Sequence, residues 1–294
     1  MKLATLRTER GPRPAVLREH SSGSLAAGYV DLRDADSELP MSLRGLLAEW
    51  DQVRDRVQRA LETARQVIPI DQAAFHAPVP DPEKIVCLGL NYREHAIESH
   101  MPIPEEPVFF SKFNPALAGH GEPVRLPRVC EQPDYEAELV VVIGKPGYRI
   151  PREQAFAHVA GYAVGNDVSA RDWQFRNAGK QWLAGKTFPT FAPVGPHLVT
   201  ADEVPDPHAL RIALRLNGQT VQDSTTAELI FRIDETIHRL STIVPLASGD
   251  LIFTGTPSGV GASRKPPLWI KPGDVMEVEI ERLGVLRNDC VDGG

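Results

Sequence analysis

The chain has 294 residues, of which 42% are hydrophobic and 24% are charged, so it can bury a sizeable core and its composition is not that of a disordered protein. Its 32 lysines and arginines against 39 acidic residues give a net charge of -7 without a basic stripe, which argues against a nucleic-acid partner. The cysteines, Cys87, Cys130 and Cys290, are widely spaced, so neither disulfides nor a zinc knuckle are expected.

The first ten residues, MKLATLRTER, include charges and lack the long apolar stretch of a secretory signal or a membrane-spanning helix. From this we expect a cytoplasmic protein without a membrane partner. The length suits one β-rich domain with a small appendage, and 26 prolines and 23 glycines favour short strands joined by turns.

Residues 1–75 are predicted to form a small N-terminal accessory domain of α+β type. Short strands are expected at residues 3–6, 15–17 and 28–32. One helix should follow, because apolar residues recur at three- and four-residue steps between Leu43 and Leu61. Ser42 is its candidate N-cap. The segment contains no cluster of reactive residues, so its predicted role is structural.

Residues 76–294 are predicted to form the catalytic domain, beginning at a proline-rich connector, residues 77–82. Apolar patterning predicts strands at residues 84–88, 108–111, 137–143, 161–167, 210–216, 251–254 and 275–280. Turns are expected at Asn217-Gly218 and residues 271–274, and helices near residues 172–177 and 234–243, the second capped by Asp234. The predicted fold class is therefore mixed α+β and rich in strands.

Two acidic residues, Glu136 and Glu138, stand at the start of the strand predicted at residues 137–143. On a strand their side chains point to the same side, with Cα atoms about 6.6 Å apart. That spacing suits two carboxylates on one cation, and oxygen ligands favour Mg²⁺, Mn²⁺ or Ca²⁺ over zinc or copper. A strand end with two solvated charges is the open alternative.

A further acid, Asp167, follows the apolar stretch at residues 161–164, where a strand is expected to end. A carboxylate at a strand exit is well placed for a functional site, so Asp167 is the candidate third ligand. The alternative is a helix cap, which is the favoured interpretation for the neighbouring Asp172.

His95 and Glu98 lie three residues apart, after the strand predicted at residues 84–88. On a helical turn they share a face and can form a hydrogen bond, which would orient the imidazole as a general base. A surface His–Glu pair without a catalytic role has the same spacing and is the commoner case.

Lys186, in KQWLAGKTF, could neutralise a substrate carboxylate or a developing enolate, although most lysines are simply solvated. The glycine-rich stretch at residues 254–261 lacks the lysine and the spacing of a nucleotide-binding loop. It is either a loop close to a ligand, with Thr256 donating a hydrogen bond, or an ordinary turn.

Together these elements resemble the fumarylacetoacetate hydrolase (FAH) family, through seven segments in the same order: LGLNYREHAIES, FFSKFNPA, DYEAELVVVIG, GNDVSARDWQ, GKQWLAGKTF, GDLIFTGTPSGVG and KPGD. The resemblance covers residues 84–287 and is closest to the subgroup called fumarylacetoacetate hydrolase domain-containing protein 2, which also carries RKPP, here residues 264–267. It implies a β-roll catalytic domain with a small N-terminal domain, paired as a homodimer.

The resemblance also implies roles for individual residues. Glu136, Glu138 and Asp167 match the family's Mg²⁺ or Mn²⁺ ligands. His95 and Glu98 match its catalytic dyad, on a segment that can order as a lid over bound ligand.

Lys186 matches the lysine that faces the substrate, and Thr256 matches a threonine near the substrate carboxylate. Lys112 matches a motif position and is included among the candidate substrate-binding residues. The other candidates, for which packing behind the pocket is the alternative, are Tyr92, Arg171 and Gln174.

The substrate implied is a small 2-oxo acid, which can chelate a metal through its carboxylate and 2-oxo oxygens. If His95, backed by Glu98, activates water beside a carbonyl at carbon 4, a carbon–carbon bond of an acylpyruvate is hydrolysed. Loss of carbon dioxide or proton transfer would instead make the site an oxaloacetate decarboxylase or keto–enol tautomerase. Hydrolysis is our first hypothesis and the oxaloacetate reactions are the second.

Leu90 bears on this choice, because acylpyruvate-cleaving relatives carry an arginine at this position of LGLNY. The missing charge puts an acylpyruvate substrate in doubt, and the subgroup resemblance favours the oxaloacetate reactions. A third hypothesis is a binding protein that kept the fold without activity. Retention of the acids, the dyad and the lysine argues against it.

Overall fold

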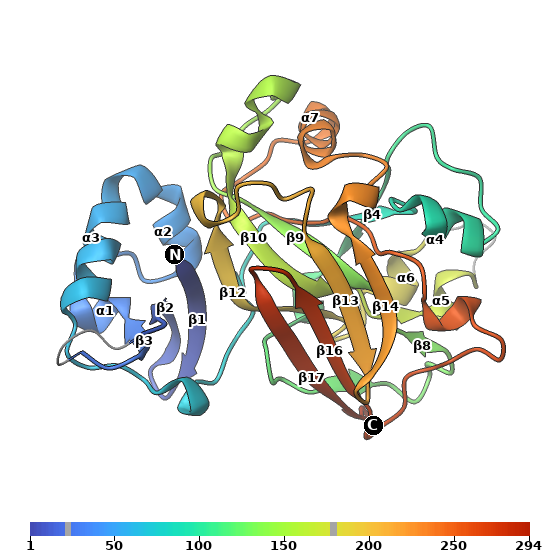
Figure 1. Cartoon of the computed structure of the whole chain (residues 1–294), viewed down its shortest axis with the longest axis horizontal. Coiled ribbons are helices and arrows are strands. Elements are labelled where there is room, and N and C mark those ends of the chain that lie inside the picture. The colour runs from blue at the N-terminus through green and yellow to red at the C-terminus, as the bar shows by residue number, and fades with distance from the viewer. Residues whose placement is uncertain (21–24, 177–180) are drawn as a thin grey trace.

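The computed structural model describes residues 1–20, 25–176 and 181–294. Its main feature is a long mixed sheet that runs through the whole molecule (Figure 1). In the described residues this sheet has ten strands, of which β6 (Leu117–Ala118) pairs only with β12. The other nine follow in the order β3 (Gly28–Asp31), β2 (Gly11–Arg18), β1 (Lys2–Thr8), β12 (Ala192–Thr200), β10 (Val159–Asn166), β9 (Ala137–Ile143), β15 (Leu251–Phe253), β4 (Ile85–Gly89) and β5 (Val108–Lys112).

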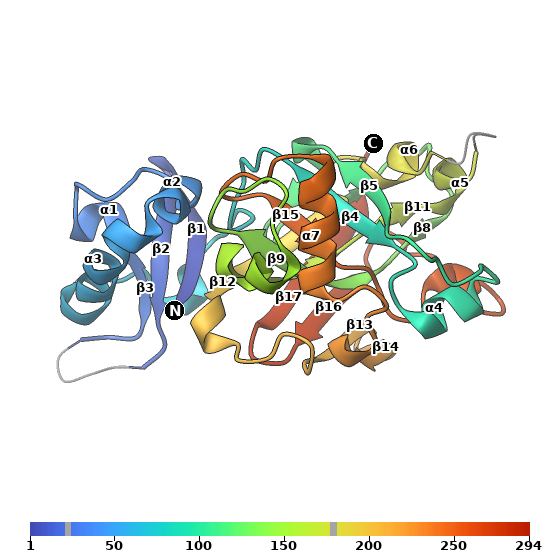
Figure 2. The same ribbon diagram turned by 90° about the horizontal axis from the view of Figure 1, so that it is seen from above.

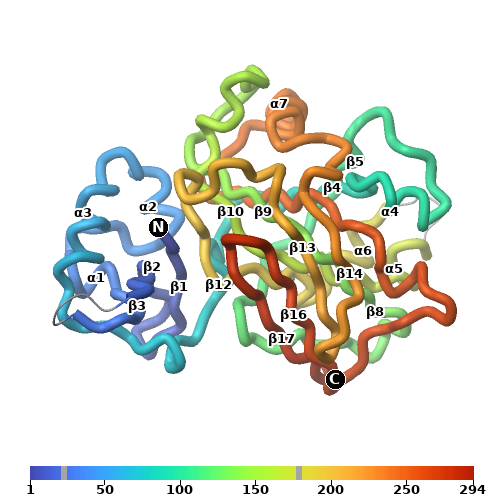
Figure 3. The backbone as a smooth tube through the Cα atoms, viewed as in Figure 1, coloured from blue at the N-terminus to red at the C-terminus, as the bar shows by residue number. Residues whose placement is uncertain are grey.

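A second sheet packs face to face against the middle of the long one, as the tube in Figure 3 shows. Its order is β14 (Gln219–Thr225), β13 (Arg211–Leu216), β16 (Val275–Ile280), β17 (Gly284–Asp292) and β7 (Val124–Leu126). Leu139 and Val141 of β9 share one buried cluster with Leu214 of β13 and Val278 of β16. Each such side chain, fully removed from water, stabilises the fold by about 1.5–3 kcal/mol.

Strand β9 is buried on both faces, which explains its nearly continuous apolar sequence. Val140 and Val142 point away from the second sheet, into another cluster that includes Phe253. Glu138 has the same parity as these two valines. Its carboxylate therefore enters the protein interior rather than solvent, where the open alternative of a solvated strand end would have placed it.

The N-terminal segment extends the long sheet, because β1 pairs antiparallel with β12, with Leu3 opposite Leu198. The helices α1 (Leu32–Ala35), α2 (Leu43–Ala48) and α3 (Trp50–Thr63) cover this end (Figure 2). The single helix predicted here is two helices, because the backbone at Glu49 leaves the helical region with φ -111° and ψ 17°. Division of the chain into domains at residue 75 stays a prediction.

Several local predictions are confirmed and two are wrong. The Ser42 side chain caps α2 by accepting from the Gly45 N–H at 3.1 Å, and Asn217 and Gly218 have the positive φ values of a type I′ turn. Asp234 does not cap α7 (Ile233–Ile243), because Arg232 is the N-cap and Asp234, in the first turn, pairs with Arg152.

Asp172 is likewise inside α5 (Arg171–Gln174) rather than at its cap, and its carboxylate accepts from the Glu131 N–H at 3.2 Å. Asn177, the predicted end of that helix, lies outside the described residues. The remaining helices are α4 (Arg93–Glu98) and α6 (Leu183–Lys186), and a short pair is formed by β8 (Pro133–Asp134) and β11 (Ser169–Ala170). Within the described ranges, no helix combines the length and apolar character needed to cross a membrane.

Candidate active site

The three predicted metal ligands come together where β9 and β10 meet. Glu136 directly precedes β9, Glu138 is its second residue, and Asp167 directly follows β10, so the antiparallel pairing of these strands sets their spacing. The Asp167 N–H donates to the Glu136 carbonyl oxygen at 2.8 Å. One carboxylate oxygen from each residue lies within 4.8 Å of the other two, and all three residues are buried.

Positive side chains compensate two of these carboxylates. The Lys186 Nζ donates to Glu136 Oε2 at 2.7 Å and to Asp167 Oδ2 at 2.9 Å. Arg171 Nη2 lies 2.6 Å from Glu136 Oε1, and Lys112 Nζ lies 2.6 Å from Asp167 Oδ1. Burial acts to raise the pKa of Glu136, but Lys186 and Arg171 outweigh it, so the pKa is lowered and the carboxylate is ionised.

Glu138 is in a different environment from its two neighbours. It accepts one hydrogen bond, from the Gly255 N–H at 2.7 Å, and forms no ion pair with any residue that the structure describes. Burial and the charges of Asp167 and Glu136 raise its pKa well above the ordinary range. A buried carboxylate short of positive charge, in a set of oxygen donors only, fits a hard divalent cation such as Mg²⁺ or Mn²⁺.

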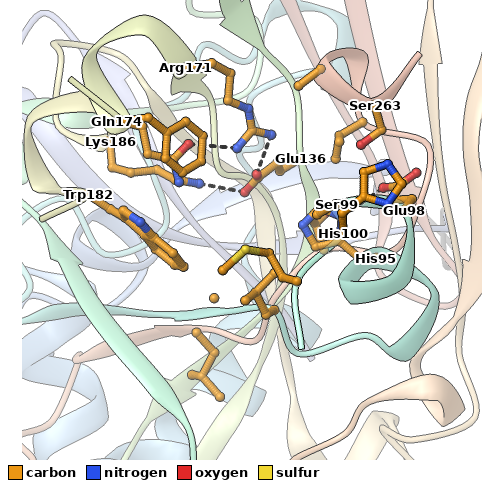
Figure 4. Close-up of a pocket in the computed structure, with 18 of the residues that line it drawn as sticks. His95, Glu98, Ser99, His100, Glu136, Arg171, Gln174, Trp182, Lys186 and Ser263 are labelled. Carbon is orange, nitrogen blue, oxygen red and sulfur yellow. Dashed lines mark hydrogen bonds and ion pairs between the residues drawn. The ribbon is translucent and has the colours of Figure 1, made fainter. Parts of the chain in front are cut away.

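The predicted dyad forms on α4. His95 Nδ1 lies 2.9 Å from Glu98 Oε1, and the Gly259 N–H fixes the other oxygen of Glu98 at 2.9 Å. A carboxylate at Nδ1 favours the tautomer with the proton there, which leaves Nε2 able to accept a proton. In Figure 4 the dyad lies on one side of Glu136 and Lys186 lies on the other.

A cavity of about 450 Å³ joins these groups, a size that suits a small organic acid. Glu136, Glu138, His95, Glu98 and Lys186 all line it. Part of the wall is apolar and is formed by Leu88, Leu90, Phe110 and Trp182. The structure therefore places the dyad, the lysine and two of the three acids around one cavity.

Three of the candidate substrate-binding residues, Arg171, Gln174 and Thr256, line this cavity. Arg171 does so while held by Asp134, which its Nε contacts at 2.9 Å, and by Gln174, which its Nη1 contacts at 2.9 Å. The Thr256 hydroxyl accepts from Gln222 Nε2 at 2.9 Å. These contacts fix the orientation of the polar wall before any ligand binds.

Tyr92 and Lys112 are not among the residues that line the cavity, so their role as substrate contacts stays a prediction. The Lys112 ammonium is enclosed by Asp167 and by the carbonyl oxygens of Val168 at 3.0 Å and Phe191 at 2.6 Å. Lys112 therefore holds the Asp167 carboxylate in position without lining the cavity. Tyr92 is buried at the start of α4, and burial raises the pKa of its hydroxyl.

Arg264 was not among the predicted site residues, although it lines the cavity. It follows the glycine-rich loop after β15, and its only signal in the sequence was the RKPP segment, which served to define the resemblance. The aromatic wall residue Trp182 gave no separate signal either, because a tryptophan among apolar residues is equally typical of a core.

A family model described as the C-terminal part of fumarylacetoacetate (FAA) hydrolase matches residues 84–291. The chain therefore belongs to the FAH family of enzymes, as its motifs predicted. Among curated proteins, oxaloacetate tautomerase FAHD2A, mitochondrial, from Bos taurus is 47% identical over 90% of this chain and 84% of its own length. Oxaloacetate tautomerase fahd2, mitochondrial, from Xenopus laevis is 42% identical over 99% of this chain and 90% of its own length.

Solved structures agree with the predicted strand-rich α+β fold of the FAH type. Fumarylacetoacetate hydrolase from psychrophilic Exiguobacterium antarcticum has a TM-score of 0.81 and 29% identity, over 99% of both chains. Maleylpyruvate hydrolase from Sphingobium sp. SYK-6, solved with manganese(II) and pyruvate, has a TM-score of 0.81 and 31% identity over 100% of both chains.

The prediction of a cytoplasmic location is contradicted by the curated relatives, whose names designate them as mitochondrial. It rested on the lack of an apolar secretory or membrane segment. That lack does not separate the cytosol from mitochondria, because mitochondrial targeting uses amphipathic, arginine-rich segments rather than apolar ones.

Proposed function

We propose that this chain is a divalent-metal-dependent oxaloacetate keto–enol tautomerase. The observation that carries the proposal is the 47% identity, over 90% of the chain, to a protein named as an oxaloacetate tautomerase. The site described above supports it, because it combines a candidate proton-transfer dyad, a buried lysine and a carboxylate set that fits a divalent ion. Of our three sequence-based hypotheses, we therefore put the second, an oxaloacetate reaction, ahead of acylpyruvate hydrolysis.

In the proposed reaction, the enol and keto forms of oxaloacetate interconvert by moving one proton between the 2-oxygen and carbon 3. Toward the keto form, the 2-hydroxyl loses its proton to water, protonated His95 gives a proton to carbon 3, and water returns a proton to His95; the reverse reaction runs these transfers backwards. Glu98 stabilises the imidazolium form of His95. Lys186, beside Glu136 and Asp167, stabilises negative charge on the 2-oxygen. A divalent ion held by Glu136, Glu138 and Asp167 would supply Lewis-acid binding of the substrate's carboxylate and 2-oxo oxygens.

Acylpyruvate hydrolysis and oxaloacetate decarboxylation remain the competing activities of such a site. Hydrolysis additionally needs a water molecule directed at carbon 4 and a place for the acyl group. Leu90 lines the cavity and carries no charge where acylpyruvate-cleaving relatives carry an arginine, which favours tautomerisation. The proposed ion is Mg²⁺ or Mn²⁺. The proposed assembly is a homodimer, which sedimentation of the purified protein would test.

The test is a parallel assay of purified protein with Mg²⁺, following the decay of enol-oxaloacetate, the decarboxylation of oxaloacetate and the cleavage of acetylpyruvate. Because enol-oxaloacetate also decays without an enzyme, Mg²⁺ alone and heat-inactivated protein serve as controls. We expect accelerated enol decay, with acetylpyruvate intact. Dominant cleavage of acetylpyruvate would instead establish the hydrolase and overturn the proposal.

A further inference from the structure

Arg264 is a cation whose position is set by neutral groups. Its Nε donates to the Tyr135 hydroxyl at 3.1 Å and to the Gly259 carbonyl at 3.3 Å, and its Nη2 donates to the Val221 carbonyl at 2.7 Å. Across the described ranges it forms no ion pair with a carboxylate. Arg264 therefore lines the cavity with a positive charge that is held in place and that no acidic side chain of the described residues neutralises.

The buried lysines and arginine of the site are already paired with acids. Lys186 and Arg171 contact Glu136, and Lys112 contacts Asp167. Lys265 also lines the cavity, but its side chain is exposed to solvent. For a second anionic group of a ligand, beyond the one that a metal would hold, Arg264 is therefore a partly buried arginine of the cavity lining that no acid already pairs, among the residues that the structure describes.

The loop that holds Arg264 also holds the dyad. Gly259 donates its N–H to Glu98 and accepts from Arg264 at its carbonyl oxygen. Gly259 has a φ of +102°, and an added Cβ would lie 2.3 Å from the Val221 oxygen, so only glycine fits there. Figure 4 shows Ser263, the residue before Arg264, beside His95 and Glu98 and across Glu136 from Trp182.

These positions match the chemistry of a 2-oxo acid with a second carboxylate. In oxaloacetate, carbon 3 lies between the 2-oxo group and the carboxylate at carbon 4. If carbon 4 is anchored on the side of the cavity that carries the dyad, carbon 3 is presented to His95. An acyl group at the same place would instead put an uncharged substituent against an unpaired guanidinium.

We propose that Arg264 binds the distal carboxylate of the substrate and makes the site selective for dicarboxylic 2-oxo acids. This rests on the proposed function for the identity of the substrate, because the metal-side carboxylate and the reacting carbon are taken from it. In this assignment Arg264 is a specificity-determining residue of the cavity lining.

The test compares two unreactive ligands that differ in the distal carboxylate. Malate carries a 2-hydroxy acid and a carboxylate at carbon 4, whereas lactate has the 2-hydroxy acid alone. Their affinities are measured by calorimetry with the Mg²⁺-loaded full chain, for the unaltered protein and for Arg264→Gln, Arg264→Lys and Lys265→Gln. Arg211→Gln, which removes an exposed arginine paired with Asp223, is the charge-matched control.

We expect malate to bind the unaltered protein more tightly than lactate. Arg264→Gln should weaken malate binding by about 10- to 100-fold, the loss of a charge-assisted pair, and should change lactate binding less than about twofold. The malate affinity of Arg264→Lys should lie between those of the unaltered protein and Arg264→Gln, because lysine keeps the charge but lacks the planar guanidinium. Unfolding temperatures of the variants show whether the loop contacts to Gly259 and Val221 were needed for folding.

Three results would overturn the assignment. The unaltered protein could bind malate no more tightly than lactate, or Arg264→Gln could change the affinities for both ligands equally. In the third result, Lys265→Gln loses malate binding and Arg264→Gln keeps it. The outcome is separable from the proposed function. If the unaltered protein accelerates enol decay but Arg264→Gln binds malate as tightly as the unaltered protein does, only this inference is wrong. If Arg264→Gln selectively loses malate binding but the unaltered protein does not accelerate enol decay, the tautomerase proposal is wrong and Arg264 still binds a dicarboxylate.

Discussion

His197 should make the stability of this protein fall steeply between pH 7 and pH 5. It lies on β12, where the N-terminal strands join the sheet, and its Nε2 is 2.5 Å from the Tyr29 hydroxyl. Its Nδ1 is buried without a hydrogen-bond partner in the described residues. Burial, reinforced by the charges of Lys2 and His120, lowers the pKa of His197 from 6.5 to about 3.

The sign follows from the direction of this shift. The unfolded chain takes up a proton at His197 below pH 6.5, whereas the folded chain does so only near pH 3. Stability is therefore fully present above pH 6.5 and is lost as the pH falls from there toward 3. Between pH 7 and pH 5 the loss amounts to about 2 kcal/mol of unfolding free energy.

The assay is urea unfolding at pH 7 and pH 5 for the unaltered protein and for His197→Gln, which keeps a polar partner for Tyr29 without the titration. Other histidines with lowered pKa values that do not interact with His197, such as His76 and His208, contribute equally to both proteins and cancel. The unaltered protein should lose about 2 kcal/mol more than the variant. Equal losses would show that His197 is solvated or protonated in the folded state and would refute the reasoning.

Three further predictions concern the site. His95→Asn should lower enol-oxaloacetate turnover by about 100- to 10,000-fold while calorimetry still detects Mg²⁺ binding; unchanged turnover would remove His95 from the chemistry. Glu138→Gln should abolish the Mg²⁺-dependent rise in unfolding temperature without lowering the metal-free value, since Glu138 lacks a cationic partner; a retained rise would place the ion elsewhere. In Gly185→Ala, the added Cβ meets Gln174 N at 2.5 Å and Ala170 O at 2.6 Å, so α6 must shift with Lys186. We expect a destabilisation of about 1–3 kcal/mol and reduced turnover, and an unchanged unfolding temperature would contradict this packing.

The predictions that succeeded rested on local geometry. Glu136 and Glu138 could be placed on one side of a strand because side chains alternate with a period of two. His95 and Glu98 could be placed together because three residues make nearly one helical turn. Asp167 was found because a strand predicted from its apolar residues ends directly before it.

What could not be predicted depends on contacts between distant segments. Nothing near Lys112 indicates that carbonyl oxygens of Val168 and Phe191 enclose its ammonium, and both are more than fifty positions away. The pairing of β1 with β12 joins residues almost two hundred positions apart, so the N-terminal strands could not be assigned to the long sheet. Asp234 looked like a cap because its residue type is common there, but Arg152 holds it within the helix.

The candidate metal ligands and the other site residues come from different segments, and this has a consequence for how new activities could arise on this fold. The candidate metal ligands Glu136, Glu138 and Asp167 are placed by two adjacent strands in the middle of the core. His95 and Arg264 come from separate segments that follow β4 and β15 at the rim. Insertions or exchanges in those rim segments can alter which acid is accepted and where its proton goes while leaving the ion in place. A library that randomises only the rim should therefore yield altered substrate range far more often than loss of fold.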